Sequence, residues 1–142
     1  MSVVLKLSRE RIDRIVSNDI YVIAMKYGPS LSRAQRFYLL EKETNNAVAC
    51  VFTDQRWKSH IPYNMSEHCE NVCAGTGYTR EEICTMASSS VGKGGSASFY
   101  RIKKVVVYNK PKSVEKFGLK CPPILWQYAK VDYDDVEVID ND

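Results

Sequence analysis

The chain has 142 residues, of which 44% are hydrophobic and 26% charged, and its formal net charge is +3 at pH 7. This composition is typical of an ordinary globular protein, and the length favours one domain with a proper core. No apolar run approaches the roughly 20 residues that a membrane-spanning helix needs, so a protein of that type is excluded.

The N-terminus and the cysteines indicate the compartment. The start, MSVVLKLSRER, lacks the architecture of a signal peptide, because its apolar patch is short and no cleavage site follows it. The five cysteines are odd in number, which argues against a disulfide framework and favours reduced thiols, partly in the core. We therefore expect a cytoplasmic protein that has no membrane partner.

The charge is distributed unevenly along the chain. Six of the 17 acids and none of the 20 bases lie from Asp132 onward, so the preceding residues carry 20 bases and 11 acids, a net charge of +9. A body of that charge attracts phosphate backbones. We expect residues 1–131 to form a single domain and 132–142 an acidic C-terminal tail. The tail either competes for the basic surface or merely frays and aids solubility.

The first elements follow from short local patterns. Val3 to Leu7 is a short apolar run that predicts a buried strand. Ser8 is a good N-cap, and apolar residues follow it at helical spacing, which predicts an amphipathic helix from about Arg9 to Ser17. Ile20 to Lys26 is rich in β-branched and aromatic residues and predicts a strand, which Gly28-Pro29-Ser30 ends.

A hairpin is predicted next. Its strands are Gln35 to Glu41 and Ala47 to Thr53, with Asn45-Asn46 at the tip of the turn. His60 to Asn64 is predicted to be a loop.

Two helices are predicted in the following region. The first begins at Ser66 and ends near Cys73. The second follows a capping-box signature, in which Thr79 is the N-cap and Glu82 the third helical residue. Ser88 to Ser98 is rich in Gly and Ser and is predicted to be the most flexible stretch.

The stretch from Phe99 to Val131 predicts a strand, a proline-broken connection and a final strand. Strand alternation places Arg101 and Lys103 on one face of the first strand and Lys104 on the other. The whole order, β-α-β-β-β-α-α-β-β, has too few helices for a doubly wound parallel sheet. It predicts an α+β fold, a small mixed β-barrel or strongly curved sheet with flanking helices.

Three stretches together indicate a family. They are LKLSRERIDRIVSNDIYVI, RFYLLEKETNNAVACVFT and YNKPKSVEKFGLKCPPILWQYAKV, and the last is the most specific, with Y-x-K-P, then E-x-F-G, then P-P before an aromatic-rich strand. The chain resembles the ASCH domains, relatives of the PUA and EVE domains, over nearly its whole length. The resemblance implies a PUA-like β-barrel with flanking helices, of the compact form found in phage-encoded and bacterial cytosolic proteins.

The resemblance also implies binding of RNA or modified nucleobases in a cleft beside the barrel. Some relatives resemble ribonucleases or amidohydrolases of acylated nucleosides, which use a Lys from a G-x-K-T-like turn after the first helix. Here that turn is Ser17-Asn18-Asp19-Ile20, with Asp19 at the lysine position, and Val22 and Ala24 replace a Glu and an Arg. Lys26 does not simply inherit the role of that lysine, so we assign no catalytic residue and expect a binding protein rather than an enzyme.

Cations interleaved with aromatic residues are the strongest candidate site. Cations position phosphates, and exposed rings stack unpaired bases. In the alternative, the aromatic rings fill the core and the cations are ordinary surface. The candidate nucleic-acid-binding residues are Lys26, Arg36, Tyr38, Arg56, Trp57, Lys58, Arg101, Lys103 and Trp126.

The loop Gly92-Lys93-Gly94-Gly95-Ser96 is a second candidate, because its glycines allow backbone N–H groups to approach a phosphate and Lys93 adds charge. Its spacing is not that of a Walker A motif. The alternatives are a flexible connection and a mobile lid over the cleft.

Zinc is the third possibility considered. Cys69 and Cys73 share a helix face beside His68, but the usual C-x-x-C knuckles are missing, so buried thiols are favoured and no metal or cofactor is predicted.

These features together predict a protein that binds RNA, single-stranded nucleic acid or a modified nucleotide in a basic cleft beside the barrel. Two alternatives remain open. One is a small hydrolase, a nucleoside amidohydrolase or ribonuclease, and the other is a phage-type protein-binding module that acts on a host protein.

Overall fold

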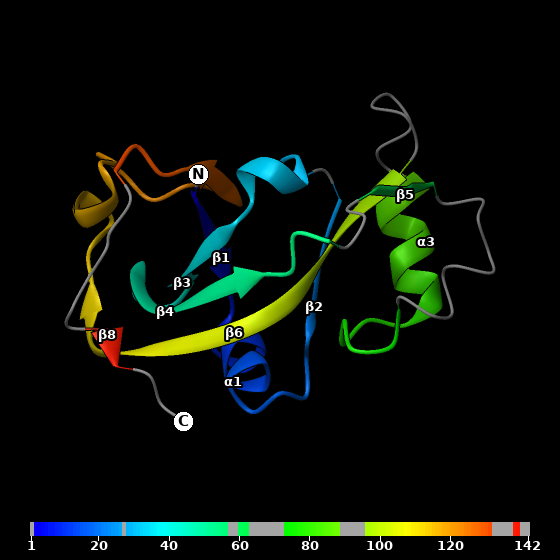
Figure 1. The fold of residues 1–142 in the computed structure, drawn as a ribbon, viewed down its shortest axis with the longest axis horizontal. Coiled ribbons are helices and arrows are strands. Elements are labelled where there is room, and N and C mark those ends of the chain that lie inside the picture. Colours follow the sequence, from blue (N-terminus) through cyan, green and yellow to red (C-terminus); the bar gives the residue numbers. More distant parts are fainter. Residues whose placement is uncertain are drawn as a thin grey trace.

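The computed structural model describes residues 2–26, 28–56, 60–62, 73–88, 96–131 and 138–139. Figure 1 shows β6 running the length of the sheet, from α3 and β5 at one end to β8 at the other. The elements are β1 (Ser2–Leu7), α1 (Arg9–Val16), β2 (Val22–Met25), the 3-10 helix η1 (Leu31–Arg33), β3 (Arg36–Glu41), β4 (Asn46–Thr53), β5 (His60–Pro62), α3 (Arg80–Ser88), β6 (Ser96–Lys112), the 3-10 helix η3 (Val114–Phe117), β7 (Trp126–Tyr128) and β8 (Val138–Ile139).

The strands form one mixed sheet. Six of them follow the order β2-β6-β4-β3-β1-β7, and β5 and β8 each pair with β6. β1 and β3 are parallel, whereas the other pairs are antiparallel. The chain passes from β1 to the parallel strand β3 through α1 and β2. The predicted first helix, α1, packs against the sheet.

Both faces of the central strands are buried, because apolar side chains alternate between two clusters. Val3, Leu5, Phe37 and Leu39 pack with Ile12 and Ile15 of α1 on one face. On the other face, Val4, Tyr38, Leu40 and Cys50 pack with Val114 and Phe117 of η3. A strand that is buried on both faces has a continuous apolar run, and this matches the sequences of β1 and β3. A third cluster packs Ile83 of α3 against Val22, Ala97 and Phe99.

Both predicted helix N-caps are confirmed. The Oγ of Ser8 accepts a hydrogen bond from the backbone N–H of Arg11 at 3.3 Å. The capping box is reciprocal, since the N–H of Glu82 donates to Thr79 Oγ1 at 3.2 Å and the N–H of Thr79 donates to Glu82 Oε1 at 2.8 Å. Among the described residues, no helix is long and apolar enough to span a membrane.

β6 is longer than predicted at both ends. The predicted flexible stretch is wrong over Ser96–Ser98, which pairs with β5 and extends the strand toward the N-terminus. The expected proline-broken connection is wrong at Pro111, which lies inside β6. The register between β4 and β6 shifts here, from Ala49↔Val107 to Ala47↔Lys112, so Pro111 lies at an irregularity where no regular ladder needs its missing N–H.

Three other predictions meet a different outcome. The loop predicted from His60 begins instead with β5, because β6 extends far enough to pair with it. The helix predicted from Ser66 lies outside the described residues, apart from Cys73 at its end. Within the predicted acidic tail, Val138 and Ile139 form β8 and pair with Tyr108 and Val107.

Candidate nucleic-acid interface

Three neighbouring strands place a cation, an aromatic ring and a second cation side by side. Arg36, the first residue of β3, has Phe52 of β4 as its Cα partner, and Phe52 has Lys104 of β6 on its other side. Directly paired residues project to the same face of a sheet. Arg36, Phe52 and Lys104 therefore form a row across three strands, which we call the cationic row.

Arg36 is held in this row by one contact with a phenylalanine and one with a tyrosine. Its guanidinium carbon lies 5.0 Å from the centroid of the Phe52 ring, a cation–π distance. One guanidinium N–H donates a hydrogen bond to the hydroxyl of Tyr38 at 3.1 Å. Tyr38 itself is fully buried, with its ring centroid 4.2 Å from that of Phe117. A planar cation with a preset orientation is thus presented at the end of the sheet.

Two further arginines lie close to one carboxylate just beyond β4. The backbone N–H and the Nε of Arg56 donate to Asp54 Oδ1 at 3.0 and 3.2 Å. The N–H of Asp54 donates to the carbonyl of Arg101 at 2.9 Å. The pKa of Asp54 is lowered below its usual value, chiefly by the hydrogen bonds from Arg56 and to a smaller extent by the positive charge of Arg101. Asp54 therefore stays ionised between them.

Lys103 occupies a bulge. Thr53 pairs with Ile102 whereas Phe52 pairs with Lys104, so the register shift leaves Lys103 as an extra residue of β6. The prediction that Arg101 and Lys103 share a face assumed strict alternation, and alternation does not hold across this bulge. Arg101, Lys103 and Lys104 are all exposed.

These residues gather where β3 begins, β4 ends and the middle of β6 passes. We call this set the basic end of the sheet; it consists of Arg36, Arg56, Arg101, Lys103 and Lys104. Four of the five are candidates named from the sequence. Lys104 and the ring of Phe52 were missed, because only the register between strands far apart in the chain places them beside Arg36.

The other end of the same strands has a different charge pattern. Arg9 lies 2.7 Å from a carboxylate oxygen of Glu41 and 3.0 Å from one of Asp13. Its backbone N–H also donates to Glu43 at 3.1 Å. There one cation lies among three carboxylates, whereas the basic end brings together five cations, of which Arg56 pairs with Asp54 and Arg101 lies near it. The field at the basic end therefore favours an anion.

Five of the other predicted site residues lie away from the basic end or outside the described residues. Lys26 is exposed just after β2, beyond the pair Met25↔Ser98, at the opposite end of β2 from Arg101. Trp126 is half-buried on β7, which lies four strands from β6 in the sheet order. Its ring packs edge-on against that of Tyr128, with 5.2 Å between the ring centroids. Lys58 and Lys93 lie outside the described residues, as does Trp57.

Tyr38 requires a correction. It was expected among the exposed aromatic residues, but its exposed fraction is 0%. β3 is buried on both faces, so its sequence does not alternate and does not show which ring faces solvent. Tyr38 therefore cannot stack a base, and its contribution to the site is the hydrogen bond to Arg36.

The turn Ser17-Asn18-Asp19-Ile20 after α1 has a structural role. Asn18 has a positive φ of 66°, and the N–H groups of Asp19 and Ile20 both donate to the carbonyl of Arg14. The carboxylate of Asp19 lies 2.6 Å from Nε of Arg14. Asp19 is thus paired with the helix it follows.

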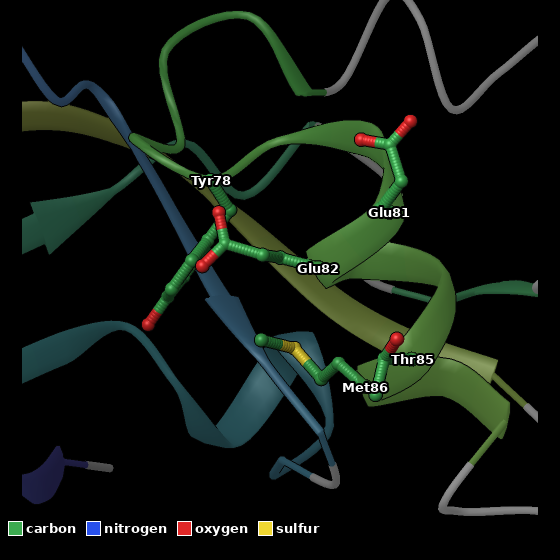
Figure 2. Close-up of a pocket in the computed structure, with 5 residues that line it drawn as sticks. All are labelled: Tyr78, Glu81, Glu82, Thr85 and Met86. Carbon is green, nitrogen blue, oxygen red and sulfur yellow. The ribbon is translucent and has the colours of Figure 1, made fainter.

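An open pocket of about 410 Å³ lies elsewhere, beside α3. In Figure 2, Tyr78, Glu82 and Met86 lie along one side of the helix, with Thr85 near Met86 and Glu81 projecting away. Arg11 covers the Tyr78 ring at 4.0 Å, and Glu82 caps the helix. These two contacts give Tyr78 and Glu82 a structural use.

The described thiols do not form a metal site. Cys50 is buried, Cys73 is half-buried and Cys121 is exposed. No group of three or more His, Cys, Asp or Glu that could hold a metal occurs in the described residues. His68 and Cys69 of the zinc hypothesis lie outside them.

Comparison with solved structures identifies the fold. The chain is similar to ASCH from Zymomonas mobilis, with a TM-score of 0.62 and 10% identity over 89% of this chain and 85% of that one. It is also similar to a serine-to-alanine mutant of that protein, with a TM-score of 0.62 and 14% identity over 89% and 86% of the two chains. A tyrosine-to-phenylalanine mutant of the same protein has a TM-score of 0.60 and 12% identity, over 89% of this chain and 88% of that one. No protein-family model and no curated protein matches the sequence.

The sheet is therefore a mixed half-barrel of the PUA-like type, flanked by short helices. The chain has the ASCH-domain fold, so the resemblance drawn from the three sequence stretches is confirmed at the level of the fold.

Proposed function

We propose that this protein binds RNA, another single-stranded nucleic acid or a modified nucleotide through the basic end of the sheet. The observation that carries the proposal is the strand register, which brings Arg36, Lys104 and the bulged Lys103 together from two strands and adds Arg101 and Arg56 beside them. Five cations in one place attract phosphates in a way that the same charges spread over a surface do not.

Each part of the basic end suits a different part of the ligand. The exposed Arg101, Lys103 and Lys104 suit phosphate oxygens, which need charge but little directional specificity. Arg36 differs, because the Tyr38 hydroxyl and the Phe52 ring orient its planar guanidinium. Guanidinium planes and aromatic rings are surfaces on which unpaired bases stack, so the row favours single strands over duplexes.

The salt dependence of binding tests this proposal. We expect a labelled single-stranded RNA of about 12 nucleotides to bind at low salt, with the logarithm of the association constant falling linearly with the logarithm of the salt concentration. Contact with about four phosphates gives a slope near −3. A duplex of the same length and a single-stranded DNA are the matched ligands, and the duplex should bind more weakly.

Two results would contradict the proposal. One is no RNA binding at tens of micromolar protein in low salt. The other is binding that does not change with salt, because an interface built on five cations must release counterions.

A further inference from the structure

Gln55 lies in the middle of the basic end of the sheet. The segment before it is fixed on two sides. The N–H of Thr53 donates to the carbonyl of Gln35, just before β3, at 3.1 Å. The N–H of Asp54 donates to the carbonyl of Arg101, in β6, at 2.9 Å. Gln55 therefore follows a segment that is attached both to the start of β3 and to β6, and it is exposed there.

The carboxamide of Gln55 is held in one orientation by a buried threonine. The hydroxyl of Thr53 has a single hydrogen, which it donates to the carbonyl of Ala34 at 2.6 Å. It can therefore only accept from Gln55, whose Nε2 donates to it at 2.8 Å. Thr53 is 4% exposed, so the core fixes its hydroxyl. These hydrogen bonds assign the nitrogen of the carboxamide to the branch beside Thr53 and the oxygen to the other branch.

One donor and one acceptor of this side chain remain for a ligand. A carboxamide has two N–H groups and one carbonyl oxygen. The bond to Thr53 uses one N–H, and neither the second N–H nor Oε1 of Gln55 has a partner among the described residues. Both groups lie in one plane, beside the cations that attract phosphate. They suit a flat ligand that offers an acceptor next to a donor.

Adenine offers this pair of groups on two edges. Its exocyclic amine is a donor and lies between two ring acceptors, N1 and N7. A glutamine can bind the amine and N7 together, and both edges are open in unpaired RNA. Guanine has two acceptors at the corresponding N7 edge, and the pyrimidines have no ring acceptor there. The remaining groups of Gln55 therefore match adenine on more edges than any other base.

We propose that Gln55 reads the base of the bound nucleic acid and selects adenine, and that Thr53 positions its carboxamide. This inference rests on the proposed function, because it needs an RNA at the basic end. It adds what the cations do not supply. Contacts with phosphate hold any sequence, and contacts with base edges distinguish one base from another.

Two RNAs that differ by one functional group test the selection. An RNA of about 12 adenosines carries the amine, whereas an equal RNA of purine riboside has the same rings and phosphates but no amine. We expect the protein to bind the adenosine RNA more tightly, by on the order of tenfold. Gln55→Met keeps the length and neutral charge of the side chain. It should abolish the preference and leave the salt slope unchanged.

Gln127→Met is the matched control for this substitution. Gln127 is an exposed glutamine of β7, opposite Val4 and away from the basic end. This variant should keep the preference for adenosine. Loss of the preference in Gln127→Met as well would overturn the assignment to Gln55.

The positioning role of Thr53 is tested by the same ratio of affinities. Thr53→Val keeps the shape of the side chain but removes the hydroxyl, so the preference for adenosine should fall several-fold. Thr53→Ser keeps the hydroxyl and should retain the preference. Both variants should first show a native thermal transition. An equal loss of preference in both would mean that Thr53 acts through packing, which overturns its positioning role.

The outcomes separate this inference from the proposed function. Equal binding of the two RNAs, with the expected salt dependence, would support binding at the basic end and overturn base reading by Gln55. No binding of either RNA at low salt would contradict the proposed function, and base reading with it.

Discussion

The guanidinium of Arg36 donates a hydrogen bond to the hydroxyl of Tyr38, a residue two positions further along the same strand, at 3.1 Å. One partner is fully buried and the other reaches the basic end of the sheet, so the pair connects the core to the candidate interface. The orientation of Arg36 is therefore set by a buried residue that no ligand can contact.

Substitution of Tyr38 by Phe tests this connection. The ring would keep its packing on Phe117, but Arg36 would lose an acceptor. We expect the free energy of unfolding to fall by about 1 kcal/mol, measured by urea denaturation, and the affinity for single-stranded RNA to fall several-fold. Phe117→Leu is the control, because it perturbs the same packing without removing the hydrogen bond. If Phe117→Leu lowered RNA affinity as much as Tyr38→Phe, Tyr38 would be only a core residue.

The capping box of α3 gives a prediction about stability. Thr79→Ala and Glu82→Ala each remove one of its two reciprocal hydrogen bonds. Each should lower the free energy of unfolding by about 1 kcal/mol, as measured by chemical denaturation. Glu81→Ala is the matched control, since Glu81 is an exposed acid in the same turn of the helix. A loss from Glu81→Ala equal to that from Glu82→Ala would show that negative charge near the helix N-terminus, and not the hydrogen bond from Glu82, is responsible.

Acid should weaken the fold through Glu41. The pKa of this carboxyl lies below its ordinary value of 4.5, first because Arg9 donates a hydrogen bond to it and then because Thr44 does. A lowered folded-state pKa stabilises the protein above the unfolded-state value, and this contribution is lost as the pH falls from 4.5 through the folded-state pKa. Glu41→Gln and Arg9→Gln should both flatten stability against pH in that window. An unchanged slope in both variants would contradict the assignment.

The two thiols at opposite extremes of exposure should react differently. Burial raises the pKa of Cys50 to about 12, so almost no thiolate forms at pH 8. Cys121 is exposed. Iodoacetamide followed by peptide mapping should modify Cys121 in the folded protein and Cys50 only after denaturant is added. Rapid modification of Cys50 under native conditions would mean that the core cluster around Cys50, Tyr38 and Phe117 opens readily.

The local parts of this fold could be predicted from the sequence, because their signals are local. Ser8 and the Thr79–Glu82 capping box act within one helical turn, and both are found where expected. The first strand and the hairpin strands also lie within a residue or two of their predicted bounds. Such elements depend on neighbouring residues and not on partners elsewhere in the chain.

The site was predicted only in part, because its geometry is not local. Nothing in the sequence around Phe52 shows that it lies between Arg36 and Lys104, since the register arises from packing across three strands. The bulge at Lys103 and the inclusion of Pro111 in β6 are both irregularities of the pairing between β4 and β6. Tyr38 was misplaced because a strand buried on both faces carries no alternation that separates core rings from surface rings.

The most direct test of the interface is to compare charge reversals at two places on the same protein. Arg101→Glu/Lys103→Glu changes the basic end, whereas Lys116→Glu/Lys120→Glu makes the same change in net charge at exposed residues of η3 and the loop after it. Both variants should be checked for a native thermal transition before single-stranded RNA is added at about 50 mM salt. The first pair should lower affinity by more than about tenfold and reduce the salt slope, and the second by no more than about threefold. Equal losses from the two pairs, or no loss from the first, would contradict binding at the basic end.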